Sequence, residues 1–458
     1  MSRYSHVLRD TPVVYVLFFL FVLLLLVLLG PWFLRAVVTM GHNLPQAEVA
    51  NDYFLGLFWA SAIAVSILIW PVPARHRAPL IGTWIVKCAV MLGFMLILES
   101  RYDIIDSWGY FEASAQKAPL FDGLSLGDGS ANIICLVRLH NYIFPYSYHG
   151  MKVTFGLFGF LGCYLFYRAL VMYLGCEDQR MFYLLLLWPS ILFWSSILGK
   201  DPIVYFGLGL YALGILGWLR TKRARYIMYA SFGVAIAMMI RVWMGPILVG
   251  ALLVFVVLTV RSLIPKVLLC ALLAASFLAG AQQVIDHFAG RGERGGAFEN
   301  INQLTASEYA RAGGSSQVVS VDLTSPTQVI RFLPLGVFTA LFRPMPGEVR
   351  NLFGTLAGLE DTALLVFMFL AVTRTSWKRL REPVMLWLAV LIVGWAVVYA
   401  PISSLNLGMG HRYRLQVMPF MLCWFLYQGR KRPKLAYVPS HPPSRLNQRG
   451  ARSLPAAR

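Results

Sequence analysis

The chain has 458 residues, of which 58% are hydrophobic and 13% are charged, and its formal net charge is +19. A soluble protein carries about 25% charged residues, so this composition excludes a soluble globular domain and indicates a polytopic membrane protein. The positive charge does not indicate a nucleic-acid partner. Much of it lies in loops between apolar segments and in a C-terminal tail, where membrane topology and anionic membrane lipids account for it.

The apolar segments predict an all-α membrane protein with about twelve transmembrane helices. Runs of about 18–22 apolar residues are long enough to cross a hydrocarbon core of about 30 Å. In chain order the predicted spans are 13–38, 52–71, 80–98, 151–174, 181–198, 202–219, 226–240, 242–260, 264–284, 359–373, 383–401 and 413–428. The first span is too long, and too closely followed by a second, to be a cleaved signal peptide. Together they predict one membrane domain over 1–428.

Basic residues in the short loops predict the orientation. They fall on alternate loops, at Arg3, Arg9, Arg75, Arg77, Arg180, Arg220, Lys222, Arg223, Arg225, Arg261, Lys266, Arg374, Lys378, Arg379 and Arg381. The positive-inside rule places these loops, and both termini, in the cytoplasm. The proline-rich tail 429–458, which is basic and has no acid, predicts a disordered cytoplasmic segment.

Two long loops, 99–150 and 285–358, fall on the outer side in this topology. Loops of this length are often lids or substrate clefts. The second contains a half-length apolar segment, 332–343, which predicts an interfacial or re-entrant helix rather than a span.

The first outer loop begins with ESRYDIIDSWGY. Glu99, Asp103, Asp106 and Tyr110 are 4, 3 and 4 residues apart, which predicts one stripe on a helix that continues out of the third span. Crowded carboxylates repel one another unless a cation or a proton relieves them. The stripe therefore indicates a general base, or a site in which Asp103 and Asp106 bind a divalent cation such as Mg²⁺ or Mn²⁺. The alternative is a solvated amphipathic helix.

Cations occur at the same outer boundary. Lys200 precedes Asp201 and Pro202 in a tight turn, where it either contacts a phosphate or completes a helix cap. Arg241, next to Trp243, either binds an anion or extends its guanidinium to the membrane–water interface. The candidate phosphate-binding residues are Lys200, Arg241, Arg343, His411, Arg412 and Arg414.

The entrance of the last span, GMGHRYRLQVMPF, places His411, Arg412 and Arg414 on the outer side, against the positive-inside bias. The planar donor fork of arginine suits phosphate or diphosphate, whereas interfacial anchoring is the alternative. Arg412 and Arg414 would lie about 200° apart on a helix, so a helical segment would not present both of them to one ligand.

Four short motifs resemble bacterial membrane glycosyltransferases of the GT-C type, especially those of exopolysaccharide and O-antigen assembly. They are D-x-x-x-Y from Asp106, W-S-S-x-L-x-K-D ending at Asp201, R-P-x-P from Arg343 and R-Y-R-L-x-x-x-P from Arg412. The resemblance implies a GT-C-like bundle, a polyprenyl-linked sugar donor, and a glycan or lipid acceptor at the outer face.

The resemblance also implies roles for single residues. Asp103 or Asp106 would be the base or a metal ligand, while Lys200, Arg241, Arg412 and Arg414 would hold the lipid phosphate. The chain departs from the pattern because it lacks a compact D-x-D or E-x-D pair and a soluble C-terminal domain.

The chemistry agrees with this distribution of charge. Inverting sugar transfer needs a carboxylate to accept the acceptor's proton and cations to stabilise the phosphate leaving group. A polymerase or ligase of lipid-linked glycan repeat units is a second possibility, which would depend on arginine and histidine without an essential acid. A transporter or flippase is a third, but its charged groups are expected near the bilayer midplane.

Overall fold

A computed structural model describes residues 28–46, 48–101, 105–116, 118–289, 326–349 and 351–428. Throughout this part of the chain the regular elements are helices. Seven of them are long and apolar enough to cross a membrane, which supports a multi-pass membrane protein. They are α2 with η2 (Val49–Ile69), α3 to α4 (Ala74–Glu99), α7 (Tyr148–Leu174), α10 (Lys200–Thr221), α13 (Leu263–Ala289), α16 (Leu352–Arg374) and α18 (Pro383–Leu405).

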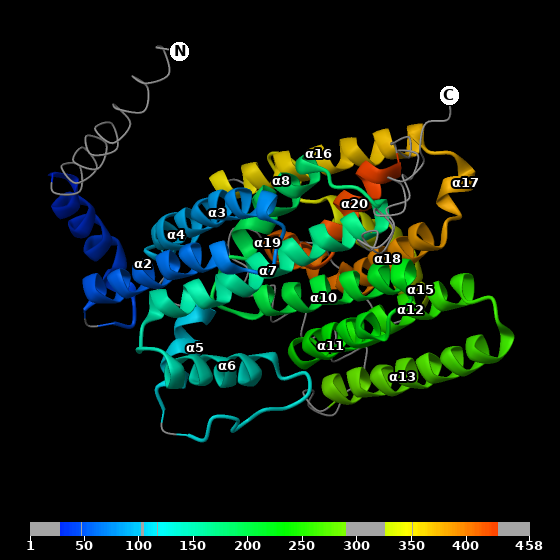
Figure 1. Ribbon diagram of the computed structural model, residues 1–458, viewed down its shortest axis with the longest axis horizontal. Helices are drawn as coiled ribbons and strands as arrows, with labels where there is room; N and C mark the ends of the chain where they lie inside the picture. Colours follow the sequence, from blue (N-terminus) through cyan, green and yellow to red (C-terminus); the bar gives the residue numbers. More distant parts are fainter. Residues whose placement is uncertain are drawn as a thin grey trace, which may run out of the picture.

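Shorter helices complete the structure. The apolar ones are α11 (Ala224–Ile240), α12 (Met244–Thr259), α15 (Pro326–Phe342) and α20 (Met418–Gln428). The others are α5 (Asp106–Ser114), α6 (Gly129–Ile143), α8 (Gln179–Leu187), α9 (Pro189–Trp194), α17 (Trp377–Leu380) and α19 (Leu407–Tyr413), with the 3₁₀ turns η1 (Gly41–Asn43) and η5 (Arg414–Gln416). Most of the long helices run side by side along the long axis of the molecule (Figure 1).

Two of the predicted spans are interrupted. The segment predicted as 181–198 is divided into α8 and α9 at Trp188, whose ψ of 128° is non-helical. Pro189 explains the break, because proline disfavours the α conformation in the residue before it. The last predicted span, 413–428, begins as the turn η5 and becomes α-helical only at Met418. Most of the predicted first span, 13–38, lies outside the described residues.

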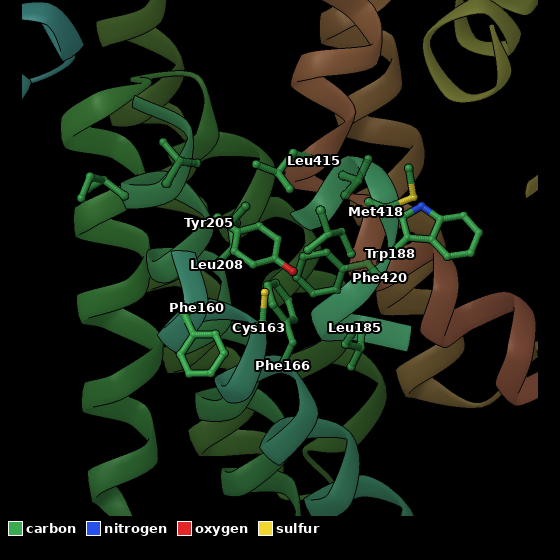
Figure 2. Packing of buried hydrophobic residues seen from close by; sticks show 14 of the residues in the cluster. Phe160, Cys163, Phe166, Leu185, Trp188, Tyr205, Leu208, Leu415, Met418 and Phe420 are labelled. Carbon is green, nitrogen blue, oxygen red and sulfur yellow. The ribbon is translucent and has the colours of Figure 1, made fainter. Parts of the chain in front are cut away.

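The helices α7 and α10 form the centre of the bundle, and α11 packs on α10 with much of its own surface exposed. Small residues let α7 and α10 approach closely: a Cβ added to Gly209 of α10 would lie 2.8 Å from the carbonyl oxygen of Gly162 on α7. Beside this contact, Phe166 of α7 packs against Tyr205 of α10 and Phe420 of α20, with ring centroids 5.1 Å apart in both pairs (Figure 2). By contrast, α13 packs mainly on α12 and lies at the edge of the bundle (Figure 1).

Contacts at the two ends of α7 agree with the predicted sidedness. At one end, Tyr148 donates to Glu99, both of which belong to the predicted outer side. At the other, Tyr173, near the cytoplasmic end of the predicted span 151–174, donates to Glu382 in a predicted cytoplasmic loop. A helix of 27 residues is about 40 Å long, so the two contacts are far enough apart for a hydrocarbon core of about 30 Å to lie between them.

The apolar segment predicted as 332–343 is part of α15, which starts at Pro326 and ends at Phe342. It has 17 residues and packs on α18. Its C-terminal residues, Ala340 to Phe342, are buried. This packing places the following turn, with Arg343, beside the entrance of the last helix.

Candidate functional site

The first outer loop does not continue the third span as one helix. α4 ends at Glu99, Ile105 is extended (φ −137°, ψ 150°), and α5 begins at Asp106. The prediction of a single acidic stripe is therefore wrong: Glu99 and Asp106 lie on different helices. Asp103 lies outside the described residues.

Instead, α5 and α6 form a folded unit that is attached to the end of α11. Asn132 Nδ2 donates to the carbonyl oxygen of Met239 over 2.6 Å, and the Gly127 N–H donates to the same oxygen over 3.2 Å. Gly127 has a φ of +83°, and a Cβ there would lie 2.8 Å from Val242, so the turn before α6 favours glycine. This attachment places the first outer loop next to Arg241.

Asp201 is the centre of an ion-pair cluster at this end of the bundle. It is fully buried in the first turn of α10, where a negative charge is favourable. Arg412 Nε donates to its Oδ2 over 2.6 Å, and a terminal guanidinium nitrogen of Arg241 donates to its Oδ1 over 3.2 Å. The Arg241 guanidinium also lies 4.3 Å from the ring centroid of Tyr413. Residues 201, 241 and 412, far apart in the sequence, are thus brought together.

Asp106 is the accessible carboxylate next to this cluster. Its side chain is 71% exposed, and Oδ2 lies 3.9 Å from a guanidinium nitrogen of Arg412. The Arg412 side chain is itself 20% exposed and lies over the ring of Trp194, 5.6 Å from its centroid. Lys200, which is half-buried, is within electrostatic range of Asp106 and of both arginines. The site thus presents a carboxylate and two partly accessible cations to solvent.

The local electrostatics keep these groups in defined protonation states. Burial, and then the nearby Asp106 carboxylate, raises the pKa of Tyr110 to about 12, so its phenol stays protonated. Burial lowers the pKa of Arg412, but Asp201 more than offsets this effect and raises the pKa above its usual value. Arg412 is therefore a permanent cation.

Arg414 points away from Arg412 into a second cluster. Its side chain is fully buried, and all three of its nitrogens donate to protein acceptors: Asp361, the carbonyl oxygen of Ala340 and that of Arg343. His411 Nδ1 lies 3.6 Å from the same Asp361 carboxylate. Both Arg412 and Arg414 were predicted to be phosphate contacts, but in the structure they contact different partners. Every nitrogen of the Arg414 guanidinium donates to a protein acceptor.

Arg343 is engaged by an acid in its own turn. Its Nε and a terminal nitrogen donate to the Oε1 atom of Glu348 over 2.9 and 2.6 Å, and the Met345 N–H donates to the same carboxylate. Burial raises the pKa of Glu348, but the Arg343 guanidinium and this N–H outweigh it and lower the pKa below its usual value. Arg343 is thus neutralised, and it is not part of the Asp201 cluster.

Glu99 belongs to a buried network below α5. Its carboxylate accepts hydrogen bonds from Lys152 Nζ over 2.8 Å and from the Tyr148 hydroxyl over 2.9 Å. Tyr148 also bonds the hydroxyl of Ser107, the residue after Asp106, over 2.9 Å. The network connects the ends of three helices, so Glu99 acts here through its neighbours and not as an exposed acid.

Several buried polar residues were not predicted from the sequence. Lys87, in α3, donates to the hydroxyls of Ser195 and Ser196 over 2.6 and 3.0 Å, in the turn that leads to Lys200. Asp52 of α2 pairs with His149 of α7. An ionisable residue within an apolar run was the available signal, because such residues are rare in spans and are usually paired or functional.

Within the described residues, no group of three histidine, cysteine or acidic side chains could hold a metal ion. No known protein family, curated protein or solved structure matches the chain. The expected metal ligand Asp103 lies outside the described part, so the pair Asp103 and Asp106 stays a prediction.

Proposed function

We propose that the protein is a membrane glycosyltransferase that moves a sugar from a polyprenyl-linked donor to a glycan or lipid acceptor. The reaction would take place at the outer face of a bacterial inner membrane, with both termini in the cytoplasm, during assembly of a cell-surface polysaccharide. The GT-C-like bundle and the total of about twelve spans belong to this proposal. The observation that carries it is an exposed carboxylate, Asp106, 3.9 Å from the partly exposed Arg412.

These two groups have the chemistry that sugar transfer requires. Asp106 would accept the proton of the acceptor hydroxyl as the sugar–phosphate bond breaks. Arg412, with Lys200 beside it, would stabilise the negative charge that develops on the leaving phosphate. Arg412 uses its Nε to donate to Asp201. Its two terminal guanidinium nitrogens would then bind phosphate, whose oxygens suit the planar fork.

The charge of the site supports an anionic donor. Lys200, Arg241 and Arg412 contribute three positive charges and Asp106 and Asp201 two negative charges, which leaves one positive charge. Since Asp201 is buried and Asp106 is exposed, an incoming phosphate meets Arg412 and Lys200 at the accessible side. Arg241 would act mainly by holding Asp201 in place.

The test is Asp106→Asn in purified protein supplied with polyprenyl-phosphate and polyprenyl-diphosphate sugars. We expect turnover to fall about 100-fold or more, because the variant keeps the shape of the site but loses its base. The matched control is Glu112→Gln, which removes an exposed carboxylate from the same helix, α5, and should leave turnover unchanged. Release of polyprenyl phosphate or diphosphate is the measured product.

If Asp106→Asn transfers sugar at the wild-type rate, the general-base mechanism is wrong. A polymerase or ligase of lipid-linked glycans, which needs no essential acid, would then be the better explanation. Loss of turnover in both variants would point to a general effect of charge on α5 and would also contradict the specific role of Asp106.

A further inference from the structure

A hollow lies between α2 and the junction of α6 with α7, and it has a volume of about 210 Å³. It is lined by Leu55, Phe58, Trp59, His140, Phe144, Pro145, Ser147 and Gly150. None of these residues belongs to the Asp201 cluster or to the network of Glu99.

His140 is the unusual member of this lining. It is only 5% exposed, and neither ring nitrogen has a hydrogen-bond partner among the described residues. Its ring stacks on Phe144 with centroids 5.0 Å apart, and Phe144 packs on Trp59 at 4.5 Å. Burying a polar group without a hydrogen-bond partner costs free energy. A ligand in the groove that hydrogen-bonds to this imidazole would remove that cost.

The imidazole is neutral in this position. Burial lowers the pKa of His140 to about 4, so at neutral pH the ring has one N–H donor and one acceptor nitrogen and no charge. A neutral donor between aromatic walls does not suit a free anion. It suits an apolar molecule that carries an uncharged oxygen acceptor.

The position of the groove identifies the source of such a molecule. Phe58, on one wall, is 72% exposed on the outer surface of α2, which is long and apolar enough to cross the membrane. Tyr142 and Tyr146 are exposed beside the start of α7, as aromatic residues are at the depth of the lipid headgroups. Under the predicted topology, the groove therefore faces the bilayer near its outer boundary, where phospholipid ester groups lie.

We propose that this groove binds one acyl chain of a bilayer phospholipid, with the His140 N–H donating to the ester carbonyl of that chain. The chain would pack along Leu55, Phe58 and Trp59, and the phosphate would remain in the headgroup layer. This site is separate from the site proposed for sugar transfer and does not depend on it. Its occupant would hold the α6–α7 junction against α2.

The test uses the full-length protein in phosphatidylglycerol and phosphatidylethanolamine vesicles that contain a trace of phosphatidylcholine with a diazirine on its acyl chain. After irradiation, mass spectrometry measures labelling of peptides from α2 and from the α6–α7 junction. We expect this labelling to saturate and to be displaced by excess unlabelled lipid. His140→Leu should reduce it about three- to tenfold, the effect of losing one hydrogen bond in an apolar site.

The control for His140→Leu is Tyr142→Leu, which changes an exposed ring on the same helix and should leave labelling unchanged. Leu55→Trp, which fills the entrance from α2, is a second variant that should reduce labelling even if His140→Leu does not fold. Peptides of α13, whose apolar surface is mostly exposed, report non-specific lipid contact. Labelling of the groove that does not saturate, or that Leu55→Trp leaves unchanged, would overturn the proposal.

Discussion

Arg412 and Arg414 show how two residues of one type can differ in role when they are two positions apart. Arg412 is partly exposed and shares its charge between Asp201 and Asp106. Arg414 is buried, and its nitrogens are used by Asp361 and two carbonyl groups. The 3₁₀ turn that begins at Arg414 contributes to this divergence. Both were predicted at the outer boundary from the sequence, and the structure distinguishes them by burial, with Arg412 partly exposed and Arg414 fully buried.

For Arg412→Lys we expect the donor dissociation constant to rise about tenfold, while acceptor affinity is unchanged. Lysine keeps the charge but loses the planar fork and one of the two simultaneous contacts. Binding of polyprenyl-phosphate sugar and of acceptor is titrated separately by calorimetry. Arg101→Lys, at an exposed position beyond α4, is the control. An unchanged donor affinity would remove Arg412 from the site.

For Arg414→Met we expect a loss of stability of about 3–5 kcal/mol, because the substitution leaves the buried Asp361 carboxylate without its main partner. Unfolding in detergent, followed by circular dichroism, measures the change. The double variant Arg414→Met with Asp361→Asn should recover part of the loss, since no buried charge then remains. A single variant as stable as the wild type would contradict a stabilising role for the pair of Arg414 and Asp361.

At the scale of elements, the gap between α4 and α5 determines where Asp106 lies. The buried network of Lys152, Glu99, Tyr148 and Ser107 connects the two helix ends across this gap. These residues form a continuous chain of three buried hydrogen bonds, which holds the first turn of α5 in place. Under the proposed function, Glu99 would therefore be a positioning residue for Asp106.

Tyr148→Phe tests this connection because it removes only the hydroxyl between Glu99 and Ser107. We expect a five- to tenfold lower kcat, with an estimated cost to stability of about 1–3 kcal/mol from the unpaired buried groups. The donor KM should change little, since the cations are untouched. Tyr146→Phe, on a nearby exposed ring, is the control. Equal loss in both variants would contradict a positioning role for the network.

For the molecule as a whole, hydropathy predicted the helical class and the approximate limits of the long helices. The predicted spans 151–174, 202–219 and 383–401 each fall within one helix: α7, α10 and α18, respectively. Hydropathy did not predict the break at Trp188, although Pro189 is a local signal for it. Periodicity could not predict the gap before α5, where tertiary contacts compete with local helical preference. Spacing alone had placed Glu99 and Asp106 on one stripe.

The membership of the candidate site could be predicted in part, because membrane topology determines which residues share one side. Topology alone assigned residues 106, 201, 241 and 412 to one side of the membrane, and the structure brings them into one cluster. The pairing of each cation with a particular acid depends on how side chains pack between helices. A single sequence carries little information about that packing. The same limit applies to Lys87 and to the pair of Asp52 and His149.

Cysteine labelling tests the orientation of the molecule. Cys176 is exposed in the loop between α7 and α8, and Leu124 is exposed in the first outer loop. In a background without other cysteines, we expect an impermeant maleimide to label Leu124→Cys in intact cells and to label Cys176 only after permeabilisation. The opposite pattern would invert the topology and would place the Asp201 cluster in the cytoplasm.

Asp201 has a consequence for ligand release. Its carboxylate accepts from Arg412 Nε, so a phosphate on the terminal nitrogens of this arginine would share the guanidinium charge with an anion that belongs to the protein itself. Under the proposed function, this sharing weakens the attraction for phosphate and keeps the affinity moderate. A spent lipid carrier would then leave readily while Asp201 keeps its bond to Nε, which protects the enzyme from inhibition by its own product.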